Sequence, residues 1–170
     1  SLRGMVDRAL LAAAERACER EVWDRCINTS DRTRNEIDLA QRFPMPFRSE
    51  VVGQANEIGL DPAYVYGLIR QESRFVMDAR SSVGASGLMQ VMPATARWTA
   101  KRIGLPFTPA MLTDRDVNLK IGTGYLKLVL DDFDGFCAGY DCEQILSRLA
   151  CPILFLRGES RLGAVMTDDD

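Results

Sequence analysis

Residues 61–93 decide the fold, and they read DPAYVYGLIRQESRFVMDARSSVGASGLMQVMP. Asp61 and Pro62 form a strong helix start, because a carboxylate can accept hydrogen bonds at the N-cap and proline fits the first helical position. Apolar residues recur after them at three- and four-residue spacing. The pattern predicts a helix that runs to about Ser73.

The second half of this stretch predicts a loop and a further helix. Residues 79–90 are rich in serine and glycine, which favours a small hairpin or an irregular loop. Pro93 opens the next helix, and Gly104 supplies a left-handed stop after Ile103. A last long helix is expected after Asp114 or Asp116, so the fold class is mainly α.

Glu72 lies on the apolar face of the first of these helices. It follows Val65, Leu68 and Ile69 at helical spacing, so a helical wheel places its carboxyl group beside their side chains. Removal from water favours the protonated form of a carboxyl group, and a protonated acid is what general acid catalysis requires. The alternative is a structural ion pair with Arg70, Arg74 or Arg80, and the wheel alone leaves both open.

The composition excludes several classes of function. The chain has 170 residues, enough for one globular domain, and 21 basic against 24 acidic side chains give a net charge of −3. An acidic chain is a poor partner for nucleic acid. It has no histidine, which excludes histidine-based catalysis and the usual zinc sites. No apolar run is long enough for a transmembrane segment.

Five cysteines form neither a metal motif nor an even disulfide framework, so buried or idle thiols are the expected state. They are Cys18, Cys26, Cys137, Cys142 and Cys151.

Three regions are expected along the chain. One amphipathic helix is predicted from Leu2 to about Trp23, followed by a polar connection at 28–34. Pro44 and Pro46 then mark a joint. The resulting division is a helical piece at 1–42, a helical domain at 43–135 and an atypical tail at 136–170.

The pairing of Glu72-Ser73 with Gly87-Leu88-Met89-Gln90-Val91-Met92-Pro93 resembles the soluble lytic transglycosylases. These are lysozyme-like enzymes that cleave the glycan strands of bacterial peptidoglycan. The resemblance covers roughly residues 23–135 and implies a lysozyme-like domain, incomplete at its C-terminal side. Residues 1–42 resemble the end of the helical region that precedes this domain in larger members.

The resemblance also implies roles for single residues. Glu72 is the expected catalytic acid and then base, cleaving the β-1,4 bond between N-acetylmuramic acid and N-acetylglucosamine to a 1,6-anhydro product. The expected substrate-binding residues are Ser73, Ser81, Gln90 and Met92. No metal or cofactor is implied. The expected partner is the peptidoglycan glycan strand, in the periplasm or cell envelope, and protein partners are unknown.

The sequence departs from the family near its end. An Ala-Tyr-Asn-Ala-Gly motif, whose tyrosine is expected beside the acid or the sugar, is absent, and residues 136–141 read FCAGYD. A catalytically impaired, vestigial glycan-binding domain is therefore an alternative, and a helical scaffold with an ion-paired Glu72 is another. Residues 153–156 predict a buried strand, and the tail resembles an α/β-hydrolase fragment.

Overall fold

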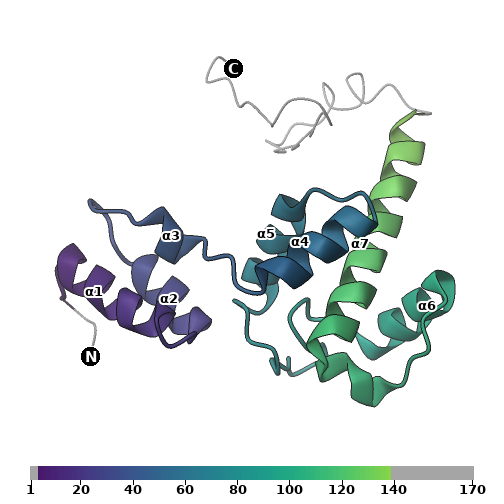
Figure 1. Cartoon of the computed structure of the whole chain (residues 1–170), viewed down its shortest axis with the longest axis horizontal. Coiled ribbons are helices and arrows are strands. Elements are labelled where there is room, and N and C mark those ends of the chain that lie inside the picture. The colour runs from purple at the N-terminus through teal and green to yellow at the C-terminus, as the bar shows by residue number, and fades with distance from the viewer. Residues whose placement is uncertain (1–3, 139–170) are drawn as a thin grey trace. The chain divides into compact units, whose positions relative to one another are not determined.

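The computed structural model describes residues 4–138, with side chains to residue 132 (Figure 1). Residues 4–130 belong to one compact unit, and a second unit begins at Asp131. The described part is helical and contains no strand, which confirms the mainly α prediction. Its elements are α1 (Asp7–Cys18), α2 (Trp23–Ser30), α3 (Leu39–Arg42), α4 (Arg48–Glu57), α5 (Pro62–Glu72), α6 (Pro93–Ile103), the 3-10 helix η1 (Pro109–Thr113) and α7 (Arg115–Ala138).

The helix predicted from Leu2 to about Trp23 is present as α1, but it is shorter than predicted and a second helix, α2, begins at Trp23. α1 ends at Cys18, and the chain turns through Glu21, whose φ is 58°. α2 then begins at Trp23 and runs into the segment that was expected to be a connection. The apolar residues keep their three- and four-residue spacing across the turn between α1 and α2. A prediction based on that spacing alone therefore does not detect the turn.

Cys18 and Cys26 form a disulfide between α1 and α2, with 5.1 Å between their Cα atoms. The expectation of idle thiols is wrong for these two residues. The bond spans a separation of eight residues and closes the corner between the two helices. The other three cysteines lie outside the residues whose side chains are described.

α5 and α6 begin and end where the sequence predicted. The Asp61 carboxylate accepts a hydrogen bond from the amide of Ala63 at 2.8 Å, and Pro62 occupies the first turn of α5. α6 begins at Pro93, and Gly104 ends it with a φ of 69°. The segment between them is an irregular loop with two isolated antiparallel bridges, Arg80 to Ser86 and Ser86 to Val91.

The first half of α7 is buried on nearly every side. Gly122 and Gly124 are buried within it, and a Cβ atom at Gly122 would overlap the side chain of Met89. Glycine weakens a helix, so its presence here reflects close packing against the loop before α6.

None of the described helices, α7 included, has the length and apolar character needed to cross a membrane.

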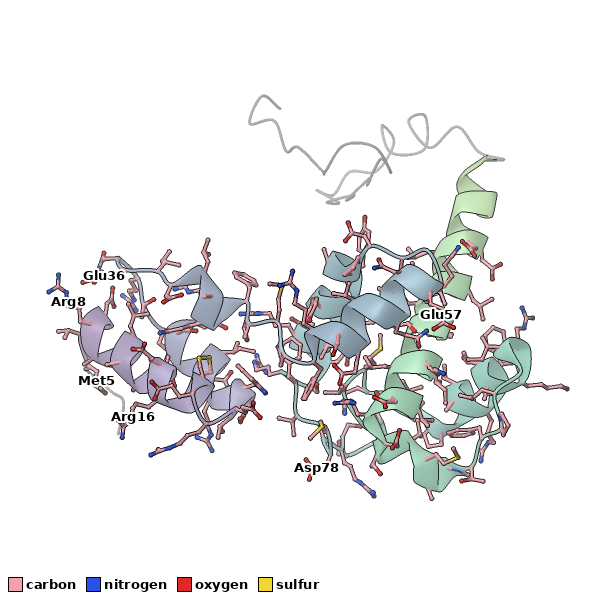
Figure 2. All side chains as sticks on the ribbon, viewed as in Figure 1. Met5, Arg8, Arg16, Glu36, Glu57 and Asp78 are labelled. Carbon is pink, nitrogen blue, oxygen red and sulfur yellow. A yellow bond between two sulfur atoms is a disulfide. The ribbon has the colours of Figure 1, made fainter. Side chains whose placement is uncertain are left out.

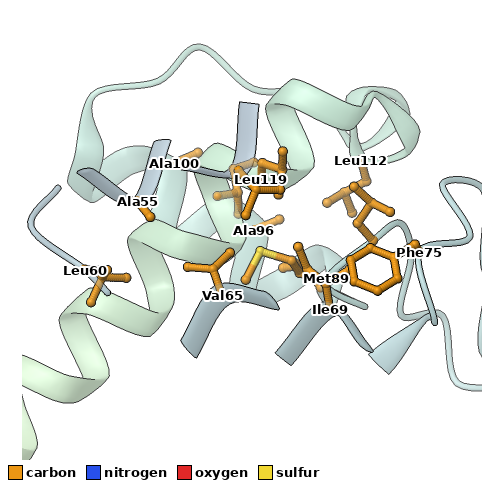
Figure 3. Close-up of a cluster of buried hydrophobic side chains, with 14 of the residues drawn as sticks. Ala55, Leu60, Val65, Ile69, Phe75, Met89, Ala96, Ala100, Leu112 and Leu119 are labelled. Atoms are coloured by element: carbon orange, nitrogen blue, oxygen red, sulfur yellow. The ribbon is translucent and has the colours of Figure 1, made fainter. Parts of the chain in front are cut away.

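The hydrophobic core gathers side chains from α4, α5, α6, η1, α7 and the loop before α6 (Figure 3). Ile27 of α2 also belongs to this cluster and is fully buried, and Trp23 packs against it. The N-terminal helices therefore contribute to the core that supports α5. Residue 136, where the tail was expected to begin, lies within α7, which runs to Ala138. The strand expected at 153–156 lies outside the described residues.

Candidate functional site

Glu72 is the last residue of α5, and its side chain is exposed. The expectation that it is buried on the apolar face is therefore wrong. Val65 and Ile69 do form a fully buried stripe, but Phe75, which is 3% exposed, continues that stripe into the core (Figure 3). A helical wheel assumes that the helix continues, whereas here the chain leaves the helix directly after Glu72.

The turn after Glu72 is held tightly by hydrogen bonds. The amides of Ser73 and Arg74 both donate to the carbonyl of Ile69, at 3.0 and 3.1 Å. The Ser73 hydroxyl accepts from the amide of Phe75 at 3.1 Å and donates to the same carbonyl at 3.4 Å. Ser73, expected to bind substrate, thus uses its hydroxyl group to fix the turn.

Two consecutive non-glycine residues of this turn are left-handed, Arg74 with a φ of 50° and Phe75 with a φ of 66°. This conformation costs about 1 kcal/mol or more for each residue and persists only where the surroundings enforce it. Burial of the Phe75 ring supplies that enforcement, and the ring lies 6.0 Å from the ring of Tyr66. The end of α5 is consequently a rigid feature.

Tyr66 links this turn to the proline joint. Its hydroxyl group donates to the carbonyl of Pro46 at 3.1 Å. Partial burial raises the pKa of Tyr66, so the phenol stays a neutral donor across the ordinary pH range.

The side chain of Glu72 makes no hydrogen bond or ion pair with any of the described residues. Arg70, a partner considered for it, instead binds Asp31, with Nη2 2.9 Å from Oδ1. The ion-paired scaffold alternative therefore has no support in this part of the chain. The carboxylate of Glu72 is available to a ligand.

Ser81 and Gln90 hold the loop before α6 together. The Ser81 hydroxyl accepts from the amide of Ala85 at 2.9 Å. The side-chain amide of Gln90, a residue with a φ of 46°, donates to the carbonyls of Ala79 and Gly87 at 3.0 and 2.8 Å. The Gln90 donors are thus engaged within the protein, which leaves its Oε1 atom as the group that a ligand could reach.

The two methionines of the motif have different environments. Met89 is 5% exposed and packs in the core, whereas Met92 is 39% exposed at the start of α6. Met92 therefore offers an apolar surface to a ligand, and Met89 does not.

Asn118 of α7 fixes this loop to the rest of the domain. It is 1% exposed, and its Oδ1 accepts from the amide of Met89 at 2.9 Å. Its Nδ2 donates to the carbonyls of Ser86 and Leu112 at 2.9 and 2.8 Å. Gly87, with a φ of 80°, packs so closely that a Cβ atom there would overlap the Asn118 side chain. The sequence analysis missed this role, although a polar residue next to apolar positions such as Leu119 and Ile121 was a signal.

Two surface pockets lie away from these residues. One, of about 300 Å³, is lined by residues of α4 and α7 that include Glu50 and Lys120. The other, of about 510 Å³, is lined by N-terminal residues that include Asp7 and Arg32. Neither includes Glu72, and the described residues contain no cluster of three carboxylate or thiol side chains that could hold a metal ion.

Residues 51–151 match the family described as the transglycosylase SLT domain. The chain is 33% identical over 122 residues to the soluble lytic murein transglycosylase of Escherichia coli K12, which covers 71% of this chain and 19% of that protein. It is 37% identical over 101 residues to the membrane-bound lytic murein transglycosylase C of Actinobacillus pleuropneumoniae serotype 5b, covering 58% of this chain and 26% of that protein.

Solved structures give the same result. An inactive mutant of the lytic transglycosylase Slt from Pseudomonas aeruginosa aligns with a TM-score of 0.72 and 36% identity. The 70 kDa soluble lytic transglycosylase of Escherichia coli aligns with a TM-score of 0.70 and 30% identity. Each alignment covers 78% of this chain and 22% of the other. The likeness confirms the lysozyme-like fold expected from the sequence.

The chain spans about a fifth of the length of the Escherichia coli relative. The family match covers more than half of this chain, from residue 51 to residue 151, and includes most of α4, all of α5 and α6, and the loop with Gln90. The chain belongs to the transglycosylase SLT domain family.

Proposed function

We propose that this chain carries the murein-cleaving domain of a lytic transglycosylase, with Glu72 as its acid and then its base. The observation that carries the proposal is the position of Glu72, which ends a rigidly held helix within the matched family domain and whose carboxylate has no partner among the described residues. Met92 and the Gln90 oxygen are the proposed sugar-contacting groups. Ser73 fixes the turn after Glu72, and Ser81 fixes the loop before α6.

A relative supports the choice of a glutamate. The Pseudomonas aeruginosa enzyme was solved as an inactive mutant in which one glutamate is replaced by glutamine. Glutamine keeps the size of the side chain and removes its acid chemistry, so that inactivity points to proton transfer by a carboxyl group. In this chain the glutamate that ends the α5 helix of the family domain is Glu72.

The chemistry follows from a single carboxyl group. Protonated Glu72 gives its proton to the oxygen that bridges the two sugars, and the bond from that oxygen to C1 breaks. The carboxylate then takes the proton of the C6 hydroxyl group, whose oxygen bonds to C1 and closes the 1,6-anhydro ring. The acid is regenerated and no water is consumed, so a second carboxylate is not needed. Because Glu72 is exposed, a bound strand must itself exclude water from it.

A second candidate is glycan binding without turnover. It is favoured by the absence of the family's tyrosine motif from residues 136–141 and by the lack of any described side chain that hydrogen-bonds Glu72. Such a domain would keep the sugar-contacting surface and lose the group that orients the acid.

A location in the cell envelope is proposed on two grounds. The curated relatives are named as murein transglycosylases, and murein is a cell-wall polymer. The Cys18–Cys26 disulfide is independent support, because disulfides persist in oxidising compartments such as the periplasm and are rare in the cytosol.

The test is incubation of the chain with purified murein, followed by mass spectrometry of the released muropeptides. Glu72→Gln is the inactivating variant. Glu57→Gln is its matched control, because Glu57 is an exposed glutamate at the last position of α4 (Figure 2). We expect anhydro-muropeptides from the wild-type chain and from Glu57→Gln, and none from Glu72→Gln.

The other outcomes select against this function. Products with free reducing ends would indicate a hydrolase with a second carboxylate. Asp78→Asn would then test the acid that is nearest to Glu72 along the chain, which is exposed on the loop after α5 (Figure 2). Retained murein binding without any product would select the glycan-binding candidate.

A further inference from the structure

Arg70 joins the catalytic helix to the N-terminal helices through three different groups. Its Nη2 atom lies 2.9 and 3.0 Å from the two carboxylate oxygens of Asp31, which directly follows α2. Its Nε donates to the carbonyl of Arg42, the last residue of α3, at 2.7 Å. Its guanidinium carbon lies 4.7 Å from the centre of the Phe43 ring. The Arg70 side chain is 21% exposed and that of Asp31 is 37% exposed, so water competes for the ion pair more than for the part-buried bond to the Arg42 carbonyl.

The groups that hold Arg70 are themselves held. The Arg42 side chain donates to the carbonyl of Ser30 at 3.3 Å and to the carbonyl and hydroxyl of Thr33 at 2.7 and 3.0 Å. Ser30 and Thr33 are buried. Arg70 is therefore attached to a fixed region rather than to mobile surface side chains.

The position of the Glu72 carboxyl group depends on this region, because the side chain has no hydrogen bond or ion pair of its own among the described residues. It lies two residues after Arg70, in the last turn of α5, where helices ordinarily fray. Its carboxyl position is set by the backbone of that turn. On one side the turn is fixed by Ser73 and the buried Phe75, and on the other side by Arg70.

We propose that Arg70 is a positioning residue through which the N-terminal helices α2 and α3 hold the turn of α5 that carries Glu72. The inference rests on the proposed function of Glu72 for its kinetic consequence. Loss of the Arg70 contacts lets the turn open and moves the acid away from the bridging oxygen, while the sugar-contacting groups beyond the turn stay in place. Turnover therefore falls and substrate binding does not.

The experiment compares two variants that break the contacts with two that break a similar pair elsewhere. Arg70→Gln and Asp31→Asn remove the two sides of the ion pair. Arg8→Gln and Glu36→Gln make the matched charge changes at a pair between α1 and the loop after α2, where Arg8 Nε lies 3.2 Å from Glu36 Oε1 (Figure 2). Each variant is assayed for kcat and KM on soluble uncrosslinked glycan strands and for hydrogen exchange at the amides of Ser73 and Arg74, with the melting temperature as a check on folding.

For Arg70→Gln and Asp31→Asn we expect kcat to fall about tenfold or more with KM within about twofold, because a small misplacement of a reacting group is costly. The Ser73 and Arg74 amides should exchange about tenfold faster, since the turn that protects them opens locally. Arg70→Lys keeps a charge toward Asp31 but cannot reproduce the planar guanidinium contacts, so it should restore part of the activity. The Arg8 and Glu36 variants should match the wild type in both measurements.

Unchanged exchange at Ser73 and Arg74 in a folded Asp31→Asn variant would overturn the proposal, as would an equal loss of kcat in the Glu36 variant or a loss confined to KM. If the wild-type chain releases no product, the proposed function fails. The exchange comparison would then still decide whether Arg70 holds the turn.

Discussion

The Asn118 side chain makes three hydrogen bonds, all to backbone atoms of the loop before α6 and of η1. Both N–H groups and one of the two oxygen lone pairs are used. The Met89 amide and the Leu112 carbonyl are buried, so removing the Asn118 amide leaves one donor and one acceptor unsatisfied, whereas the Ser86 carbonyl keeps its bond from the Val91 amide. The residue therefore determines the shape of the motif that carries Gln90 and Met92.

We expect Asn118→Ala to lower the free energy of unfolding by about 3 kcal/mol, from lost hydrogen bonds and unsatisfied buried groups. Urea denaturation measures this loss. Asn56→Ala is the matched control, because Asn56 is exposed on α4 and alanine is the better helix former, so stability there should stay level or rise slightly. A loss at Asn118 no larger than at Asn56 would contradict the structural role.

Glu72 illustrates what the sequence could and could not predict about the site. The motif identified the residue, and the N-cap at Asp61 located the helix that carries it. The burial of Glu72 was predicted wrongly, because the left-handed residues Arg74 and Phe75 end the helix. No glycine or proline in the sequence marks this helix end. Two non-glycine residues adopt this conformation only through tertiary contacts, which local patterns do not contain.

α7 is a central helix whose glycines serve as contact surfaces. We expect Gly122→Ala to destabilise the protein by about 2 kcal/mol, because the new methyl group must displace Met89. Gly53→Ala in α4 should instead stabilise by about 1 kcal/mol, since nothing lies near its Cβ position and alanine favours a helix. Thermal unfolding of both variants would show shifts of opposite sign, and two shifts of the same sign would refute the packing argument.

The α1–α2 corner is stabilised by the disulfide. Replacement of Cys18 and Cys26 by serine should lower stability by about 2.5 kcal/mol, the chain-entropy value for a loop of this size. Guanidinium denaturation of the double variant against the oxidised wild type gives the difference. The reduced wild type is the control, and it should unfold with the double variant. Stability unaffected by either change would mean that the bond adds nothing to the corner.

The unfolding of the whole domain in acid should depend on Asp7, which ties the start of α1 to the loop after α2. Its Oδ2 accepts hydrogen bonds from the amides of Arg34, Asn35 and Glu36 at 3.1, 2.7 and 3.1 Å. The bonds from Asn35 and Glu36 are the main cause that lowers the pKa of Asp7 below its ordinary value of 3.8. A carboxyl group whose pKa is lowered by folding stabilises the protein above its ordinary pKa, and this contribution disappears as the pH falls through the lowered value.

Asp7→Asn should therefore melt at a lower temperature than the wild type near neutral pH, and the gap should close as the pH drops below about 3.8. Melting curves across this range measure the gap. Asp78→Asn is the control, because that carboxylate is exposed and has no described partner, and its gap should be small throughout. A gap for Asp7→Asn that widens in acid would reverse the sign and refute the assignment.

Across the whole molecule, the helical architecture was predictable because the signals that define it are local. Asp61, Pro62, Pro93 and Gly104 mark ends of α5 and α6 directly in the sequence. The contribution of the N-terminal helices was not predictable. It depends on Ile27 and on Arg70, whose partners are far away in the chain, and no periodicity records such pairings.

The sulfur link between α1 and α2 sets a condition on how this protein is made. A cytosol rich in glutathione keeps thiols reduced, so chains that fold there would lack the Cys18–Cys26 bond. Recombinant material should therefore be exported during expression or refolded with an oxidant. In a preparation made without that step, α1 and α2 would not be joined by the disulfide. Activity measured on it would belong to the reduced protein and not to the oxidised one.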